Sequence, residues 1–238
     1  MAINVWGNVD ENLMKEKYDN VIDKFDTIYE IIDKLSESLI EKWFEDENGE
    51  FNVNYFYKSV EYQVANDERK LLEDFNFLCL DIATSYSKAL VHFDVMENLN
   101  NDTEEYKFEM YWFQYYAQFA IRLIGTFEDY IYHYVNLFNG YQITNNARFK
   151  CEVSKKLKND KKINVKNALE TSKSNLNKYR NDITHNFNIF KNRKLIKKEV
   201  DKLEINEPSI NSPEQFIKDF EEILNDVFDK FNKVFKLN

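Results

Sequence analysis

The sequence predicts an all-α protein, folded as an up-and-down antiparallel bundle of about five long helices. Its 238 residues include only four Gly and two Pro, so signals for turns are scarce. Apolar residues recur three and four positions apart through most of the chain, which is the period of an amphipathic helix. A chain of this length can bury a sizeable core. We therefore expect one helical domain over residues 1–238, built from long helices with few connections.

Two predicted helices occupy the first hundred residues. The apolar period predicts one helix over about 13–44, and the pair Asn48-Gly49 follows its end. A second helix is predicted over about 55–99, with a candidate break at Asn66-Asp67. We expect these N-terminal helices, in residues 1–100, to pack on a core formed by about 103–238.

The third and fourth predicted helices lie in the middle of the chain. Thr103 precedes two glutamates, a composition typical of a helix N-terminus, and we extend this helix to Phe138, before Asn139-Gly140. The fourth helix is predicted over about 165–190. Its apolar stripe consists of Ala168, Ser172, Leu176, Tyr179, Ile183, Phe187 and Phe190.

The fifth predicted helix ends the chain. Ser212 suits the N-cap position, and Pro213 suits the first helical position because its missing N–H has no partner there in any case. Helical spacing of apolar residues continues to about Phe235. The C-terminal helix is thus expected over about 213–235.

Nothing in the sequence directs the chain to a membrane or out of the cell, so we expect a cytoplasmic protein. The first residues lack the order of a signal peptide. The most apolar run, Met110 to Gly125, contains polar residues and is shorter than the roughly 20 residues of a membrane-spanning helix. Cys79 and Cys151 are far apart and form no CxxC pattern, so both are expected to be reduced.

Charge is distributed unevenly along the chain, which carries a net charge of −10. Residues 148–198 contain sixteen Lys and Arg against four acidic residues, an excess of twelve positive charges. The rest contains sixteen basic and thirty-eight acidic residues, an excess of 22 negative charges. The basic segment can be a solvated face balanced by acidic helices, or it can attract phosphate within one Debye length, about 8 to 10 Å.

Common catalytic signatures are missing from the sequence, which has no phosphate-binding glycine loop, HExxH, GxSxG or EF-hand pattern. Three histidines are too few for a site built on several imidazoles, so no metal and no cofactor are expected. His92 has no acidic residue four positions away on either side, which favours a role in helix packing or at the surface.

His133 belongs to a polar stripe on the aromatic helix predicted over 103–138. The stripe consists of Gln114, Gln118, Arg122, Asp129 and His133. Buried polar groups need partners, so the stripe can be a structural network that fixes the register of the helices. Alternatively, Arg122, Asp129 and His133 can support a site on the facing helix.

The sharpest functional signal is the stretch from Arg180 to His185. Cleavage of RNA without a metal needs a proton acceptor for the 2′-hydroxyl, a proton donor for the 5′-oxygen and a cation beside the phosphorane. An imidazole titrates near neutral pH, and a guanidinium stays charged and binds two phosphate oxygens at once. Asn181 can orient the phosphate or the imidazole. The basic residues flanking this stretch, Lys178, Lys191 and Arg193, are the expected substrate contacts.

These residues resemble the mark of the HEPN superfamily, which consists of helical bundles named for nucleotide binding in higher eukaryotes and prokaryotes. That mark is an Arg, a polar residue and a His after four to six intervening positions, and 179–185 fits the four-residue version. The helix segment 120–131 is also similar to the helix that pairs with the motif helix in bacterial members. The resemblance covers about 106–194, and it makes the core of about 103–238 HEPN-like.

The resemblance implies a homodimer in which two copies of the motif form a shared cleft. It also implies a metal-independent endoribonuclease that leaves a 2′,3′-cyclic phosphate and a 5′-hydroxyl, often as a toxin or in phage defence. Arg180 would stabilise the transition state, His185 would act as acid or base, and Asn181 would position the phosphate. Some relatives are controlled through a Tyr two residues after the His; Phe187 stands at this position, which argues against such control.

Helix geometry limits what one copy of the motif can do. At 100° per residue, Arg180 and His185 lie about 140° apart around a regular helix, so one helix cannot direct both side chains at one phosphate. A distorted turn or a second subunit is required, and a two-fold dimer supplies the latter. Besides RNA and a second copy, an antitoxin or regulatory protein is an expected partner. The alternatives are a non-catalytic dimeric module that binds protein or RNA and, last, a nucleotide-binding regulator.

Overall fold

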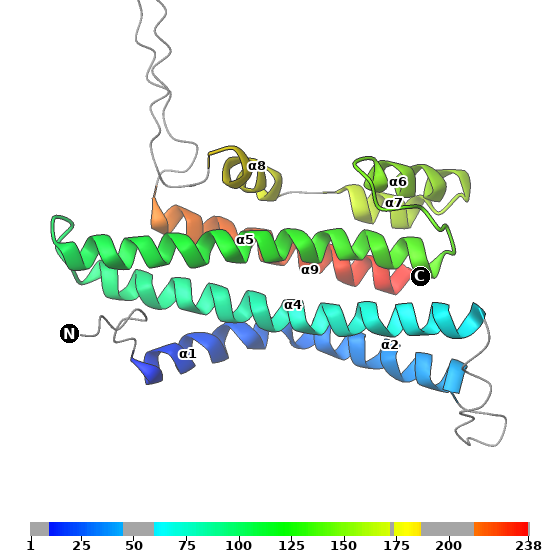
Figure 1. Ribbon diagram of the computed structural model, residues 1–238, viewed down its shortest axis with the longest axis horizontal. Coiled ribbons are helices and arrows are strands. Elements are labelled where there is room, and N and C mark those ends of the chain that lie inside the picture. Colours follow the sequence, from blue (N-terminus) through cyan, green and yellow to red (C-terminus); the bar gives the residue numbers. More distant parts are fainter. Residues whose placement is uncertain (1–9, 45–59, 172–173, 187–211, 238) are drawn as a thin grey trace, which may run out of the picture. The chain divides into compact units, whose positions relative to one another are not determined.

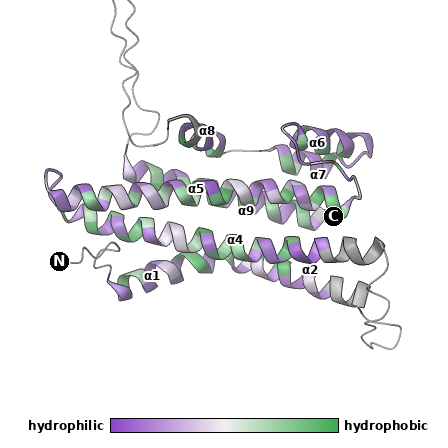
Figure 2. Ribbon diagram, in the orientation of Figure 1, coloured by the Kyte–Doolittle hydropathy of each residue, from purple (hydrophilic) through white to green (hydrophobic). Residues whose placement is uncertain are grey.

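The computed structural model describes residues 10–44, 60–171, 174–186 and 212–237 (Figure 1). Over these ranges the protein is an all-α helical bundle without a strand, which confirms the predicted fold class. Hydrophobic and hydrophilic residues are interleaved along the long helices, as amphipathic helices require (Figure 2).

The N-terminal helix is divided in two. Helix α1 spans Glu11–Ile22, a 3-10 turn spans Asp23–Phe25, and helix α2 spans Asp26–Phe44. The sequence predicted one continuous helix here. Buried apolar residues continue through the turn, which ends at the buried Phe25, so the periodic pattern carries no trace of the interruption.

Two long helices follow, and both agree with the prediction over the described residues. Helix α4 spans Val60–Glu97 and passes through Asn66-Asp67 without a break, so the candidate break was wrong. Helix α5 spans Glu104–Phe138. The Thr103 hydroxyl accepts a hydrogen bond from the Tyr106 N–H at 3.1 Å and thereby caps α5. Gly140 follows its end with φ of 64°, a backbone conformation that favours glycine.

The basic segment forms short helices instead of one long one. Helix α6 spans Phe149–Asn159, α7 spans Ile163–Glu170 and α8 spans Leu176–Asn186. The continuous helix predicted over 165–190 was therefore wrong. Thr171 is extended with ψ of 112°, and its hydroxyl donates to the Asn167 carbonyl at 2.7 Å. A hydroxyl that bonds the preceding helical turn in this way competes with helix continuation.

Helix α9 spans Pro213–Leu237, in agreement with the predicted C-terminal helix. The Ser212 hydroxyl accepts a hydrogen bond from the Gln215 N–H at 3.2 Å, which confirms Ser212 as the N-cap. One face of α9 is buried. Its buried apolar residues are Phe216, Phe220, Ile223, Leu224, Val227, Phe228, Phe231 and Val234.

The chain forms two compact units that each draw on both halves of the sequence. Unit 1 comprises residues 1–21, 82–125 and 174–225, and unit 2 comprises residues 22–81, 126–173 and 226–238. Unit boundaries fall within α1, α4, α5 and α9. In the core of unit 1, Tyr86 stacks on Phe220 with ring centroids 4.1 Å apart. In the core of unit 2, Phe75 meets Phe127 edge to face at 5.0 Å.

Both cysteines are free; Cys79 is buried and Cys151 is exposed. Burial raises the pKa of the Cys79 thiol far above its ordinary value, which suits a packing role. Among the described residues, no helix combines the length and apolar character that a membrane crossing requires.

Candidate functional site

Helix α8, which carries the Arg180 motif, is anchored to unit 1 by one buried face. Leu176, Tyr179 and Ile183 are buried and spaced by three and four residues. The Tyr179 hydroxyl donates to the Asp219 carboxylate at 2.7 Å, and its ring meets Phe216 edge to face at 5.7 Å. Burial and the Asp219 carboxylate raise the pKa of Tyr179, so the hydroxyl remains a donor at physiological pH. Helix α8 is thus fixed against α9 within this unit.

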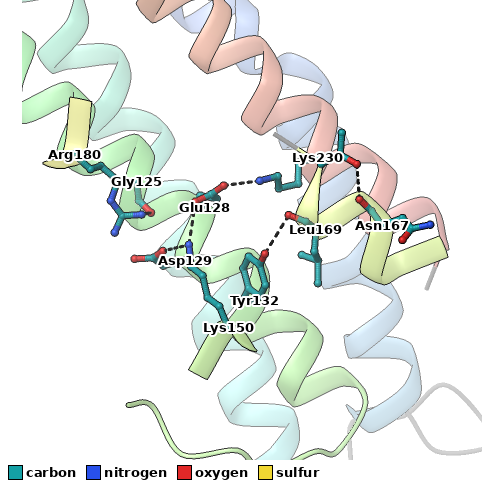
Figure 3. A network of polar contacts seen from close by, with 10 residues as sticks. Gly125, Glu128, Asp129, Tyr132, Lys150, Asn167, Leu169, Arg180 and Lys230 are labelled. Atoms are coloured by element: carbon teal, nitrogen blue, oxygen red, sulfur yellow. Dashed lines mark hydrogen bonds and ion pairs between the residues drawn. The ribbon is translucent and has the colours of Figure 1, made fainter. Parts of the chain in front are cut away.

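Arg180 lies against a glycine of helix α5. Its Nη1 donates to the Gly125 carbonyl at 3.5 Å (Figure 3). A Cβ atom added at Gly125 would lie 3.0 Å from both the Cδ and the Nε of Arg180. Glycine within a helix normally costs about 0.5–1 kcal/mol relative to alanine. At this position its lack of a side chain lets the half-buried guanidinium approach the backbone of α5.

The other predicted site residues of this region are either exposed on α8 or have side chains outside the described part of the structure. Lys178 and Asn181 are exposed, one on each side of Arg180 in the sequence. The backbone of His185 belongs to the last turn of α8, but its side chain lies outside the described part of the structure, as do Lys191 and Arg193 entirely. The structure therefore gives the helical position of His185 and not the direction of its imidazole.

The backbone of α8 is regular between Arg180 and His185. The helix is α-helical from Leu176 to Asn186 with no 3-10 or π turn. The step of 100° per residue therefore holds, so the Cα atoms of Arg180 and His185 lie about 140° apart around the helix axis. No distorted turn is present in the described backbone between Arg180 and His185.

The predicted supporting residues fall in different parts of the molecule. Arg122 is exposed on the portion of α5 that belongs to unit 1. Asp129 and His133 belong to unit 2, where Asp129 pairs with Lys150 of α6 at 2.6 Å and His133 stacks on Phe149 of α6 at 4.4 Å. Burial first, and then the charge of Lys150, lower the pKa of His133 against the opposing effect of Asp129. These contacts fasten α6 to α5.

Unit 2 contains a buried network of ion pairs that the sequence did not predict. The Glu128 side chain of α5 is 8 % exposed and binds Lys230 of α9 at 2.5 Å and Lys150 of α6 at 3.0 Å (Figure 3). Burial alone would raise the pKa of Glu128, but Lys230 and Lys150 together bring it below its ordinary value. Glu128 and Lys230 lie 102 positions apart in the chain, so no local pattern indicates the pair.

Part of the positive charge of the basic segment is used inside unit 2. Lys150 binds both Glu128 and Asp129, and Lys166 pairs with Glu170. Lys155, Lys156 and Lys158 are exposed on α6. Some cations of this segment are therefore paired within the fold, whereas others are exposed to solvent.

His92 has an acidic partner on another helix, which residue spacing within one helix does not indicate. Its Nδ1 lies 2.6 Å from Glu109 Oε2, which comes from the next helix. The imidazole is buried, which decides for helix packing between the two roles, packing or surface, that the sequence favoured. The signal that could have revealed the pair is that α4 and α5 are antiparallel neighbours across a short connection, which places 92 opposite 109.

Among the described residues, no group of three or more His, Cys, Asp or Glu is arranged to hold a metal ion. Comparisons with models of protein families, with curated proteins and with solved structures find no match to this chain. The resemblance to the HEPN superfamily thus rests on the motif from Arg180 to His185 and on the helix that faces it.

Proposed function

We propose that this protein is a metal-independent endoribonuclease of the HEPN type that acts as a homodimer in the cytoplasm. The observation that carries the proposal is the placement of Arg180. Its helix is anchored by a fully buried tyrosine one residue earlier, and its guanidinium is held against the Gly125 carbonyl at the half-exposed edge of α8. Lys178 and Asn181, on the exposed side of the same helix, add a second cation and an amide.

The proposed reaction is cleavage of RNA by its own 2′-hydroxyl. The 2′-oxygen attacks phosphorus while the bond from phosphorus to the 5′-oxygen breaks, which leaves a 2′,3′-cyclic phosphate and a 5′-hydroxyl. His185 accepts the proton of the 2′-hydroxyl or donates one to the leaving 5′-oxygen. Arg180 stabilises the negative charge that develops on the phosphorane oxygens, and Asn181 positions the phosphate.

The geometry of α8 supports the proposal of a dimer. Because Arg180 and His185 diverge around a regular helix, the proposed site takes the arginine from one copy and the histidine from its partner. An RNase of this kind must be restrained in its own cell. The proposal therefore includes an antitoxin or regulatory protein, in keeping with a role as a toxin or in phage defence.

The test is cleavage of single-stranded RNA by purified protein in EDTA. Wild type is expected to cut, with products that carry cyclic phosphate ends by mass spectrometry. Arg180→Ala removes a charge that stabilises the transition state and should lower the rate by about 10²–10³. His185→Ala removes a general acid or base and should lower it by about 10²–10⁴.

Two matched variants serve as controls. One removes an arginine charge and the other removes an imidazole ring, both outside the motif. Arg148→Ala removes an exposed arginine from the same basic segment, and His133→Gln removes the imidazole that stacks on Phe149. Both should cut RNA at the wild-type rate. No cleavage by wild type, or equal cleavage by wild type and the two motif variants, would refute the proposal.

A second candidate function, a non-catalytic dimeric interaction module, is favoured by the outer face of α5. Four aromatic side chains spaced by three and four residues, Phe108, Tyr111, Tyr115 and Phe119, are between 38 % and 60 % exposed. Exposed aromatic residues in a row are typical of protein interfaces. If Tyr111→Glu/Tyr115→Glu converts a dimer to a monomer in sedimentation, and wild type leaves RNA intact, this candidate replaces the first.

A further inference from the structure

A pocket of about 440 Å³ opens in unit 1 between α1, α4 and α5, and the proposed nuclease does not use it. Met14 and Tyr18 of α1 and Tyr116 of α5 supply its apolar surfaces. Lys88 and His92 of α4 supply polar groups. Pockets for small molecules have volumes of about 300–1,000 Å³ and are mostly apolar with a few placed polar groups. In size and lining, this pocket matches that description.

The imidazole in the wall of the pocket is held in place before any ligand arrives. His92 is 4 % exposed, and its Nδ1 lies 2.6 Å from Glu109 Oε2. A carboxylate accepts hydrogen bonds, so Nδ1 carries the proton of this contact. The ring also lies parallel to Tyr116, with an angle of 8° between the planes and centroids 5.7 Å apart. A polar group fixed by both a carboxylate and a stacked ring is preorganised for binding.

Contacts between α1 and α4 also fix the α1 side of the pocket. Lys17 of α1 pairs with Asp94 of α4 at 2.5 Å. The Ser87 hydroxyl of α4 lies 3.3 Å from the Lys17 carbonyl oxygen. These contacts hold α1 against α4 in the part where Met14 and Tyr18 line the pocket. The cavity is therefore bounded by helices that bind one another.

The side chains of the pocket fit one class of ligand. Lys88 Nζ lies 5.1 Å from the centre of the Tyr116 ring, so a cation sits beside the stacked rings. Lys15 adds a second cation, against the single carboxylate of Glu11. Flat aromatic walls favour a planar ring in the ligand, and the excess of cations favours a negative group on it.

We propose that this pocket binds a planar aromatic anion, with its ring beside Tyr116 and its negative group at Lys88. A nucleoside monophosphate and an aromatic carboxylate both have this chemistry. Binding at this pocket is independent of RNA cleavage, because none of its lining residues belongs to the motif from Arg180 to His185.

The test measures binding of two anions and their neutral counterparts to the full chain by titration calorimetry. The probes are adenosine 5′-monophosphate with adenosine, and indole-3-acetate with indole-3-ethanol. At least one anion should bind about tenfold or more tightly than its neutral counterpart, a difference of about 1.4 kcal/mol. The pair that shows this difference indicates whether the ligand is a nucleoside monophosphate or an aromatic carboxylate.

Variants place the binding in the pocket. Lys88→Gln should weaken the anion about tenfold while leaving the neutral counterpart unchanged. Met14→Trp should fill the cavity and abolish binding, with circular dichroism and thermal unfolding used to verify the fold. Lys155→Gln, which removes an exposed lysine of α6, is the matched control and should bind as wild type does.

Three results would overturn the inference. One is equal affinity for the anion and its neutral counterpart, and another is full affinity in folded Met14→Trp or in Lys88→Gln. The third is no binding of any probe up to about 10 mM, beyond the weak end of specific affinities. The assay contains no RNA, so its result and that of the cleavage assay are separate.

Discussion

Lys230 and Arg180 are two cations that the fold treats in different ways. The Lys230 side chain is 3 % exposed and binds the buried Glu128, which is itself shared with Lys150. Arg180 is half-buried, lies on a short surface helix and donates to the carbonyl of a glycine. The first cation is enclosed with a carboxylate, whereas the second is half-buried against the backbone of α5.

The difference indicates where stability and function are concentrated. A buried ion pair gives little net stability over an apolar pair, but removing one partner is costly because the other charge stays buried. A partly exposed arginine can be lost with little effect on folding. Variants of the Glu128 network should therefore change the free energy of unfolding, and variants around Arg180 should change RNA cleavage.

The largest expected effect is that of Lys230→Met on stability. It leaves Glu128 buried with only Lys150, and breaking a buried pair costs about 3–5 kcal/mol, so we expect a loss near 3 kcal/mol in urea unfolding. Lys233→Met, which removes the exposed partner of Asp229, should cost less than about 1 kcal/mol. Equal stability of the two variants would contradict the role given to the buried pair.

Next in size is Tyr179→Phe, which tests the anchor of α8. The variant loses a hydrogen bond to the Asp219 carboxylate, and such bonds contribute about 1.5–3 kcal/mol. Asp219 keeps its bond from Gln215, so a loss near 1.5 kcal/mol is expected. Because this tyrosine precedes Arg180, the cleavage rate should also fall. A variant with wild-type stability and rate would show that the hydroxyl does not hold α8.

A smaller effect is expected for Gly125→Ala, which separates the stability of the fold from the rate of RNA cleavage. Alanine favours the helix by about 0.5–1 kcal/mol, so stability should stay equal or rise slightly. The new Cβ would displace the guanidinium that lies 3.0 Å away, and cleavage should fall about tenfold. In an Arg180→Ala background the same change should have no further effect on cleavage. An additive loss there would argue against the contact.

The smallest effect is on the pH dependence of stability and again concerns Glu128. Its folded-state pKa is below the ordinary value of 4.5, so its ionised form stabilises the fold above about pH 4.5. This contribution is lost as the pH falls through the folded-state pKa. The stability gap between wild type and Glu128→Gln, from urea unfolding at several pH values, should therefore narrow below pH 4.5. A constant gap would contradict the lowered pKa.

Local patterns in the sequence predicted much of the fold. The caps at Thr103 and Ser212 and the extents of α5 and α9 follow from hydrogen bonds within a few residues of each other. The break at Thr171 could not be predicted in the same way. The apolar stripe of the sequence continues from α7 to α8, whereas the Thr171 hydroxyl bonds the preceding turn, a contact that competes with helix continuation.

Less of the candidate site could be predicted, because its contacts join distant residues. The motif itself is contiguous and visible in the sequence. The approach of Arg180 to Gly125 spans 55 positions, and the pair of Glu128 with Lys230 spans 102. A polar stripe indicated that Asp129 and His133 need partners, but it could not indicate that those partners lie on α6.

The most direct test of the central claim, that Arg180 and His185 act from two subunits, is complementation between inactive variants. Arg180→Ala and His185→Ala are mixed after unfolding and refolding, and RNA cleavage is measured in EDTA. Each variant alone should be inactive. The mixture should recover roughly a quarter of wild-type activity, because half of its dimers are mixed and each of these keeps one of two composite sites. A mixture that stays inactive would contradict the shared site.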